Sequence, residues 1–410
     1  MERYDILYQL YDEFPTDRLR QHQEFVDVFP PVDSRVALEG WQKASDELER
    51  LKDEVRNAFE TGEILAEIAA RTTREQAFTA LDLYAKYGRS INVLVLDVDE
   101  TLRSAGHTDN EIPRETLYLL RQFHEDSVPI VICTGQTLEN VKGFTIQGLG
   151  SELVHSGTMS IVYESGTGAF TPGHGARTKQ LLYEDLPVDD VAVFDEVRAR
   201  VLADAPEEIR RGCHLQGNEF NVTLKPNFEI GSTDAREIVD RALVHLLELL
   251  GEAAANAVGI DGPTEEWART HYAAADQEIE AVLDSFDEPT DADVPAELTE
   301  LFERIDVAYY EADAAEIASL ELNKVVGVNA AFDVLGIDEP FALVMGDSKS
   351  DLRVMEWVRE HDSGIAAAPD HASLDVLDHV LRTDELIFDG GDSAEMLRVA
   401  YALNLLAKLD

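Results

Sequence analysis

Short apolar runs and amphipathic stretches alternate in two separate parts of this chain. In the first part, residues 91–96 (INVLVL) and 128–133 (VPIVIC) are apolar and rich in β-branched side chains, as strands buried on both faces of a sheet require. Helical sequence follows each strand, and the same alternation returns near the end of the chain. The expected helices are 115–125, 138–144, 324–335, 351–359 and 394–409, and the later strands are 341–345 and 364–367. This alternation predicts an α/β fold with a parallel sheet and right-handed crossovers.

Residues 171–320, between these two parts, have a different pattern. Residues 220–224 (FNVTL) and 305–310 (IDVAYY) alternate apolar and polar side chains, which predicts strands, with helical sequence between them. Residues 252–300 are rich in Ala, Asp, Glu and Pro, and we interpret them as an exposed, partly mobile insertion. A second, α+β domain is therefore expected to interrupt the α/β domain.

The first 88 residues have the pattern of helices. Apolar residues recur there at intervals of three, four or seven and form one stripe, which consists of Trp41, Leu48, Leu51, Val55 and Phe59. Thr72 and Glu75 have the spacing of a capping box, and Gly88 is a suitable helix stop. We interpret this part as a helical extension that packs on the next domain, with a partner-binding module as the alternative.

The charge of the chain excludes some partners. It has 82 acidic and 34 basic residues, a formal net charge of −48. Nucleic acid and anionic membranes are bound by clustered Lys and Arg, so neither is an expected partner. The acidic residues are interleaved with periodic apolar ones, and 45% of all residues are hydrophobic, which favours a folded chain. Because salt screens repulsion, this composition is typical of a protein from an organism with high internal salt.

Targeting signals are not visible in the sequence. There is no apolar stretch of roughly 18 residues and no basic segment followed by an apolar run at the start, so we expect a soluble, cytoplasmic protein. Two cysteines, Cys133 and Cys213, are too few for a disulfide framework. The histidines lack the spacing of a zinc site.

Two carboxylates, Asp97 and Asp99, directly follow the first predicted strand in the sequence DVDET. In open α/β sheets, ligands bind beyond the carboxyl ends of the strands. Two carboxylates about 4 Å apart repel each other by roughly 4 kcal/mol at an effective dielectric near 20, so a cation or a proton must lie between them. Mg²⁺ prefers oxygen ligands and also binds phosphate oxygens. Taken alone, such a pair is more often a solvated turn at a strand end.

Three further motifs follow in order. Thr134 and Gly135 end the second predicted strand, where a hydroxyl and backbone N–H groups can hold a phosphoryl oxygen. Lys324 begins a predicted helix, and Asp347 and Asp351 follow a later strand in the sequence GDSKSD. Each has an ordinary alternative: a turn, a solvated lysine, and an N-capped helix start.

Together, the four motifs resemble those of the haloacid dehalogenase-like superfamily in type, order and strand context. The resemblance covers residues 91–173 and 320 to the C-terminus, and it implies a Rossmann-like parallel sheet with an inserted C2-type α+β cap. Thr134-Gly135, Glu164-Ser165-Gly166 and Asn323-Lys324 are similar to the branch that contains sugar-phosphate, phosphoglycolate and mannosyl-phosphoglycerate phosphatases. The implied domains are a helical extension (1–88), a first core part (89–172), the cap with its acidic insertion (173–320) and a second core part (321–410).

The resemblance also implies roles for the motif residues. Asp97 is the expected nucleophile, and Asp99 the general acid and base. Thr134, Gly135 and Lys324 are expected to bind the phosphoryl oxygens. The expected Mg²⁺ ligands are Asp97, the backbone carbonyl of Asp99, Asp347 and Asp351. The chain departs from the branch at four positions: Glu100 replaces the usual Gly, Gln136 a common Arg, and Ser165 and Ser350 the usual Asn.

These features predict a Mg²⁺-dependent phosphatase that acts on a small phosphorylated sugar or sugar acid. A phosphomutase of the same superfamily is one alternative, because it forms the same aspartyl phosphate. A regulatory binding protein that uses the N-terminal helices is another, which the four intact motifs disfavour. A protein phosphatase is disfavoured because a large cap restricts the site to small substrates.

Overall fold

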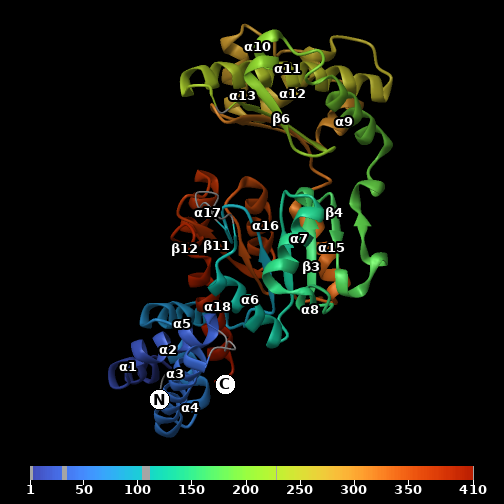
Figure 1. Ribbon diagram of the computed structural model, residues 1–410. Coiled ribbons are helices and arrows are strands. Elements are labelled where there is room, and N and C mark those ends of the chain that lie inside the picture. The colour runs from blue at the N-terminus through green and yellow to red at the C-terminus, as the bar shows by residue number, and fades with distance from the viewer. Residues whose placement is uncertain (1–2, 30–34, 104–110, 228, 410) are drawn as a thin grey trace. The chain divides into compact units, whose positions relative to one another are not determined.

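The computed structural model describes residues 3–29, 35–103, 111–227 and 229–409 (Figure 1). The chain forms two compact units. The first consists of Met1–Tyr163, Ala169–Gln180 and Gly327–Asp410, and the second of Glu164–Gly168 and Leu181–Val326. The predicted cap is residues 173–320. The main segment of the second unit, Leu181–Val326, begins and ends later, and the unit also includes the separate short segment Glu164–Gly168.

The first unit is built on a parallel sheet. Over the described residues, the strand order is β12-β11-β10-β1-β2-β3-β4-β5. The strands are β1 (Val93–Leu96), β2 (Ile130–Cys133), β3 (Met159–Tyr163), β4 (Gly168–Phe170), β5 (Gln180–Leu181), β10 (Ala342–Met345), β11 (Gly364–Pro369) and β12 (Leu386–Phe388). The pairs from β12 through β11, β10, β1 and β2 to β3 are parallel. The four predicted strands of this part are confirmed as β1, β2, β10 and β11.

Helices accompany the sheet in the order that the alternation predicts. They are α6 (Arg114–Glu125), α7 (Leu138–Leu149), α8 (Ser151–Val154), α15 (Lys324–Leu335), α16 (Lys349–Glu360), α17 (Leu374–Thr383) and α18 (Ser393–Ala407). Short 3-10 turns η1 (Glu164–Gly166), η2 (Pro172–His174), η3 (Ala176–Thr178) and η4 (Leu182–Asp185) flank β4 and β5. In β1, β2 and β10 every residue is buried, and their sequences are continuously apolar, as strands covered on both faces require. Strand β3 is also buried throughout and includes one polar residue, Ser160, whose hydroxyl hydrogen-bonds with that of Thr171.

The N-terminal extension is helical, as predicted. Its helices are α1 (Arg3–Glu13), α2 (Thr16–Val28), α3 (Arg35–Ala58), α4 (Gly62–Arg71) and α5 (Arg74–Tyr87). Helix α5 ends at Gly88, which has the expected left-handed backbone with φ 64°. The capping box is formed by Thr73 and Gln76, one residue later than predicted, because the Thr72 hydroxyl instead donates to the carbonyl of Ile68.

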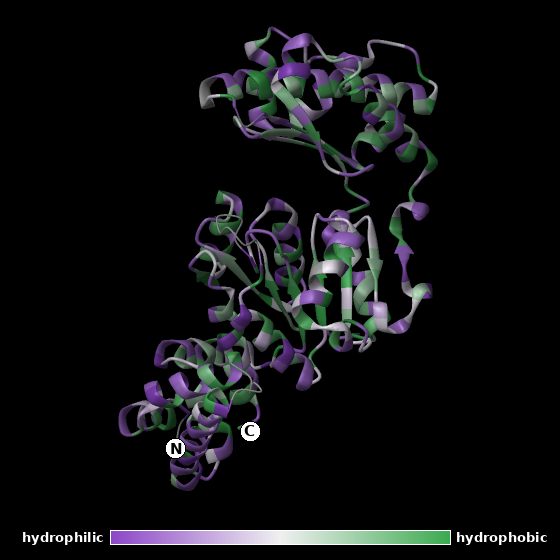
Figure 2. Cartoon of the chain, viewed as in Figure 1, coloured by the Kyte–Doolittle hydropathy of each residue, from purple (hydrophilic) through white to green (hydrophobic). Residues whose placement is uncertain are grey.

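The N-terminal helices share one hydrophobic core with the sheet. A single cluster of buried apolar side chains includes Leu7 and Leu65 from these helices, Leu94 from β1 and Leu403 from α18. Hydrophilic and hydrophobic residues alternate along these helices (Figure 2). The extension is therefore an integral layer of the first unit.

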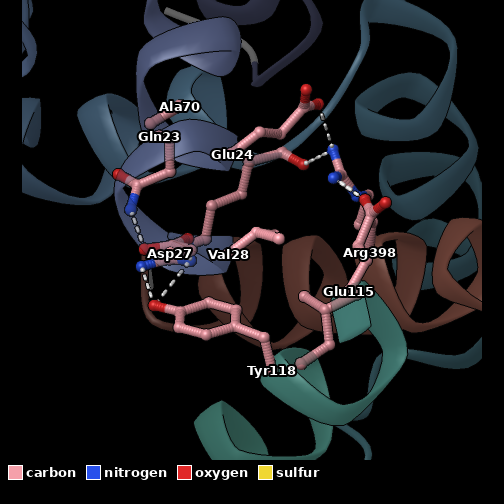
Figure 3. A pocket seen from close by; sticks show the side chains of 10 residues that line it. Gln23, Glu24, Asp27, Val28, Ala70, Glu115, Tyr118 and Arg398 are labelled. Atoms are coloured by element: carbon pink, nitrogen blue, oxygen red, sulfur yellow. Dashed lines mark hydrogen bonds and ion pairs between the residues drawn. The ribbon is translucent and has the colours of Figure 1, made fainter. Parts of the chain in front are cut away.

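Buried charges also connect the N-terminal helices to the rest of the first unit (Figure 3). Nη1 of Arg71 on α4 lies 2.9 Å from Oδ2 of Asp27 on α2. Arg398 on α18 donates to the backbone carbonyl of Arg71 at 3.0 Å, and it pairs with Glu24 on α2 and Glu115 on α6. These groups line a cavity of about 20 Å³, enough for one water molecule.

The second unit packs helices on an antiparallel sheet of order β6-β7-β9-β8. The strands are β6 (Cys213–Gln216), β7 (Asn221–Pro226), β8 (Ile305–Tyr310) and β9 (Ala314–Ser319). The helices are α9 (Val188–Arg200), α10 (Glu207–Gly212), α11 (Ser232–Val258), α12 (Thr264–Ala275), α13 (Gln277–Ser285) and α14 (Ala296–Phe302). The two strands predicted here are confirmed as β7 and β8. The second unit has its own apolar core.

The interpretation of residues 252–300 as an exposed, partly mobile insertion is wrong. This stretch contains the end of α11, all of α12 and α13 and most of α14, and Trp267, Ile279, Leu283 and Leu298 are buried in the core of the second unit. The acidic residues lie on the outer faces of short helices whose apolar residues recur at helical spacing. The overall composition of this stretch did not reveal its helical periodicity. A short helix needs few apolar residues to bury one face, so most of its residues can still be acidic or small.

Candidate active site

Three carboxylates converge where β1 and β10 end. One oxygen each of Asp97, Asp347 and Asp351 lie within 4.8 Å of one another. Strands β1 and β10 are parallel neighbours, so their carboxyl ends meet at the same edge of the sheet. The backbone N–H of Asp97 continues this pairing by donating to the carbonyl of Met345 at 2.9 Å. Asp97 is only 6% exposed, so its negative charge is largely removed from water.

The start of α16 places Asp351 in this cluster. Oδ2 of Asp351 accepts hydrogen bonds from the backbone N–H of Ser348 at 3.1 Å and from its hydroxyl at 2.6 Å, as part of a capping box. Gly346 leaves room for the carboxylate, because a Cβ atom there would lie 2.3 Å from the Cγ of Asp351. The capping box of α16 and the absence of a side chain at Gly346 therefore determine where this carboxylate lies.

The cluster has the chemistry of a site for a hard cation. Carboxylates at such separations repel each other by a few kcal/mol, and a divalent cation removes that repulsion. The hydroxyl of Thr101 donates to Oδ1 of Asp347 at 3.3 Å and leaves further oxygen lone pairs available. The donors are all carboxylate oxygens, as Mg²⁺ requires, and none is the sulfur or imidazole typical of zinc sites.

Asp99 is held by two side chains that sequence reasoning did not assign to the site. Nε and Nη2 of Arg103 donate to Oδ1 of Asp99 at 3.0 and 2.7 Å, and Nε2 of Gln136 donates to Oδ2 at 2.6 Å. Gln136 was noticed only as a departure from the phosphatase branch. The sequence does not reveal the contact of Arg103 with Asp99. Two side chains four residues apart meet only in some turn conformations, and the sequence does not show which conformation this turn adopts.

Thr134 and Gly135 follow β2, which is the parallel neighbour of β1 on the side away from β10. Thr134 is buried, its backbone N–H donates to the carbonyl of Val162 at 3.0 Å, and its hydroxyl accepts the N–H of Gln136 at 3.2 Å. Gly135 is exposed. Both residues therefore lie at the same sheet edge as the carboxylates.

Lys324 belongs to the second unit, whereas the other predicted site residues belong to the first. It begins α15 and is 2% exposed. The side-chain oxygen of Asn323 caps this helix by accepting the N–H groups of Val325 and Val326 at 2.9 and 3.2 Å. Gly166, with φ 98°, packs so closely that a Cβ atom would lie 2.0 Å from the carbonyl oxygen of Asn323.

Comparison with known proteins gives a family match. The model of the haloacid dehalogenase-like hydrolases matches residues 263–377, which include Lys324, Asp347 and Asp351. No curated protein matches. In the part of the chain that the structure describes, no helix combines the length and apolar character that a membrane span needs.

The solved structures that align with this chain include two phosphatases and one hydrolase. Trehalose-6-phosphate phosphatase of Aspergillus fumigatus is 14% identical, with 78% of this chain and 97% of that chain covered and a TM-score of 0.40. A sugar phosphatase of HAD subclass IIB is 15% identical, with 77% and 99% covered and a TM-score of 0.42. A HAD/COF-like hydrolase of Plasmodium vivax is 12% identical, with 82% and 100% covered and a TM-score of 0.47.

Proposed function

This chain is a haloacid dehalogenase-like hydrolase, and we propose that it is a Mg²⁺-dependent phosphatase that hydrolyses the phosphomonoester of a small sugar or sugar acid. The convergence of Asp97, Asp347 and Asp351 at one sheet edge is the observation that carries the proposal. A buried carboxylate nucleophile beside further carboxylates needs a divalent cation, and phosphoryl transfer uses the same cation.

In the first proposed step, an oxygen of Asp97 attacks phosphorus, and the bond between phosphorus and the ester oxygen breaks. The leaving oxygen takes a proton from Asp99, so that the alcohol departs neutral and Asp97 carries the phosphoryl group. In the second step, Asp99 removes a proton from water, which attacks the phosphoryl group and releases inorganic phosphate. Asp97 returns to its carboxylate form.

The other motif residues would stabilise charge during both steps. The carboxylate cluster would hold Mg²⁺, which when bound neutralises charge on the phosphoryl oxygens. The ligands would be Asp97, Asp347, Asp351 and the backbone carbonyl of Asp99. The hydroxyl of Thr134, the backbone of Gly135 and the ammonium group of Lys324 would bind the phosphoryl oxygens.

The second unit, which we propose to be the cap, carries several polar side chains on one face of its sheet. Val222 and Leu224 of β7 are buried in its core, so the residue between them, Thr223, points to the opposite face of the sheet. Thr223 pairs in register with Gln216 of β6 and Glu316 of β9, and its hydroxyl donates to Oε2 of Glu316 at 2.7 Å. Hydroxyl, amide and carboxylate groups on one sheet face match the hydrogen-bonding needs of a sugar.

A screen of phosphorylated metabolites with phosphate release as the readout tests the proposal. The full chain is assayed with Mg²⁺ and with EDTA, in molar KCl, against sugar phosphates, sugar-acid phosphates and a phosphoserine peptide. Release from small sugar phosphates that needs Mg²⁺ and disappears in Asp97→Asn supports the proposal. Transfer of the phosphoryl group to another substrate position without release would identify a mutase instead. Binding without turnover of any phosphoester would contradict the enzymatic role.

A further inference from the structure

The loop after β11, residues 370–373, contacts both of the loops that carry the carboxylates. The backbone N–H of Ser373 donates to the carbonyl of Asp347 at 2.8 Å. Nε2 of His371 lies 3.0 Å from the backbone carbonyl oxygen of Glu100. Because a carbonyl only accepts, this nitrogen carries the hydrogen. The loop therefore connects the Asp347 loop to the turn that follows Asp99.

The contact with Glu100 is made where the backbone is unusual. Glu100 has φ 57°, in the left-handed region that residues with a Cβ atom rarely adopt. Gly adopts such a conformation without strain, whereas the Cβ atom of Glu is crowded by the backbone. With Glu at this position, the turn depends on contacts from other segments for its conformation. The imidazole of His371 makes one such contact, the hydrogen bond to the carbonyl of Glu100. The same Nε2 atom also lies 3.6 Å from Oε2 of Glu100.

The ring of His371 is itself oriented by its neighbours. Its Nδ1 lies 3.4 Å from Oδ1 of Asp370, and the same oxygen accepts the backbone N–H of Gly390 at 3.0 Å. Gly390 also makes room for the ring, because a Cβ atom there would lie 2.5 Å from Nδ1 of His371. The loops after β11 and β12 thus determine which way the imidazole points.

We propose that His371 is a positioning residue that holds the Glu100 peptide, and through it the adjacent Asp99, in place for proton transfer. The inference rests on the proposed function, since it concerns the acid and base of that reaction. If the peptide of Glu100 rotated, the backbone of Asp99 would rotate with it and its carboxylate would change direction. Arg103 and Gln136 hold the carboxylate of Asp99, whereas His371 holds the backbone that follows it.

Dependence on the leaving group tests this role. The aryloxide of an activated aryl phosphate can leave without a proton, whereas the alcohol of an alkyl phosphate needs one from Asp99. In His371→Ala at saturating Mg²⁺, kcat for an alkyl phosphate should fall about tenfold or more, while kcat for an aryl phosphate changes less than about twofold. KM should change little for either, because His371 does not touch substrate in this proposal. His371→Gln should restore part of the alkyl activity, because its amide can donate to the carbonyl of Glu100.

A second variant and a control distinguish the proposed role of His371 from a general folding defect. Gly390→Ala should displace the imidazole and reproduce the selective loss on alkyl phosphates while His371 remains present. His361→Ala, the same change at an exposed histidine at the end of α16, should leave both activities at the wild-type level. A wild-type ratio of alkyl to aryl turnover in both His371→Ala and Gly390→Ala, or equal losses on the two substrates, would overturn the inference. Wild-type protein that hydrolyses neither substrate would overturn the proposed function instead.

Discussion

Gly346 and Asp351 are in contact across the start of α16, because the carboxylate of Asp351 fills the space in which a side chain at position 346 would lie. A Cβ atom on Gly346 would be 2.3 Å from both the Cβ and the Cγ of Asp351. Gly346 directly follows β10, and the carboxylate belongs to the cluster that also contains Asp97 and Asp347. The missing side chain at 346 is therefore a requirement of the carboxylate cluster.

We expect Gly346→Ala to weaken Mg²⁺ binding about 10- to 100-fold, the usual effect of disturbing groups that orient metal ligands. The added methyl group must push Asp351 away from the other carboxylates. Titration calorimetry with Mg²⁺ measures the change. Gly143→Ala is the matched control, since that glycine lies exposed on α7 with no other atom within 4 Å of an added Cβ. Equal Mg²⁺ affinity in the two variants would show that the cluster does not depend on Gly346.

The two carboxylates after β1 should have separable effects. Asp97→Asn should lose Mg²⁺ affinity and turnover together, because it removes both the proposed nucleophile and a proposed charged ligand of Mg²⁺. Asp99→Asn keeps its backbone carbonyl, so it should retain Mg²⁺ binding while kcat on alkyl phosphates falls about 10²–10⁴-fold. Steady-state kinetics on alkyl and aryl phosphates, with Mg²⁺ titrations, check both. Near-normal turnover of an alkyl phosphate by Asp99→Asn would show that another group is the acid.

The buried ion pair of Arg71 and Asp27 should be important for stability. Arg71→Met leaves the Asp27 carboxylate without its partner in a site that is only about a tenth exposed. We expect a loss of about 3 kcal/mol in the free energy of unfolding, measured by urea denaturation in molar KCl. Arg382→Met breaks the exposed pair with Asp378 and should cost less than about 1 kcal/mol. Similar losses in the two variants would mean that burial does not strengthen the first pair.

Stability should increase with salt. A net charge of −48 makes the folded chain repel itself, and the Debye length shortens from about 10 Å at 0.1 M to about 3 Å at 1 M. Both the melting temperature and the activity should therefore rise between 0.1 and 2 M KCl. Scanning calorimetry at several KCl concentrations measures the first effect. A melting temperature that does not depend on KCl would contradict adaptation to high salt.

Mild acid should destabilise the second unit. Burial lowers the pKa of His245 on α11 below its ordinary value of 6.5, and the hydrogen bond to the carbonyl of Val201 only partly offsets this effect. At a pH just below 6.5, the unfolded chain binds a proton that the folded chain does not, so stability is lost as the pH falls. Urea denaturation between pH 7.5 and 5.5 should show this slope. It should be smaller in His245→Gln and unchanged in His155→Gln, which alters an exposed histidine.

Much of the fold follows from local sequence patterns. Strands β1 and β10 are recognisable because they are buried on both faces and therefore apolar throughout. Helix α15 begins at Lys324 and ends at Leu335, as its pattern predicts. The fold class and the order of motifs depend on such short-range signals, so they were predictable. The capping box of α5 was misplaced by one residue, since Thr72 and Thr73 are equally good caps until their hydrogen bonds are known.

Contacts between distant residues needed the tertiary structure. Asp97 and Asp347 lie far apart in the sequence, and their meeting depends on the pairing of β1 with β10. The contacts of Arg103 with Asp99, and of His371 with Glu100, depend on turn conformations that leave no periodic signal.

The sequence by itself predicted most of the strands and helices, because burial on a strand or a helix face imposes a period on neighbouring residues, and it named the candidate site residues through their motifs. Only the tertiary structure decided that the N-terminal helices share the core of the sheet and that the acidic stretch of residues 252–300 packs as helices in the second unit. Both outcomes depend on which apolar faces meet. Many pairings of faces are compatible with one hydrophobic pattern, and the packing of the whole chain selects among them.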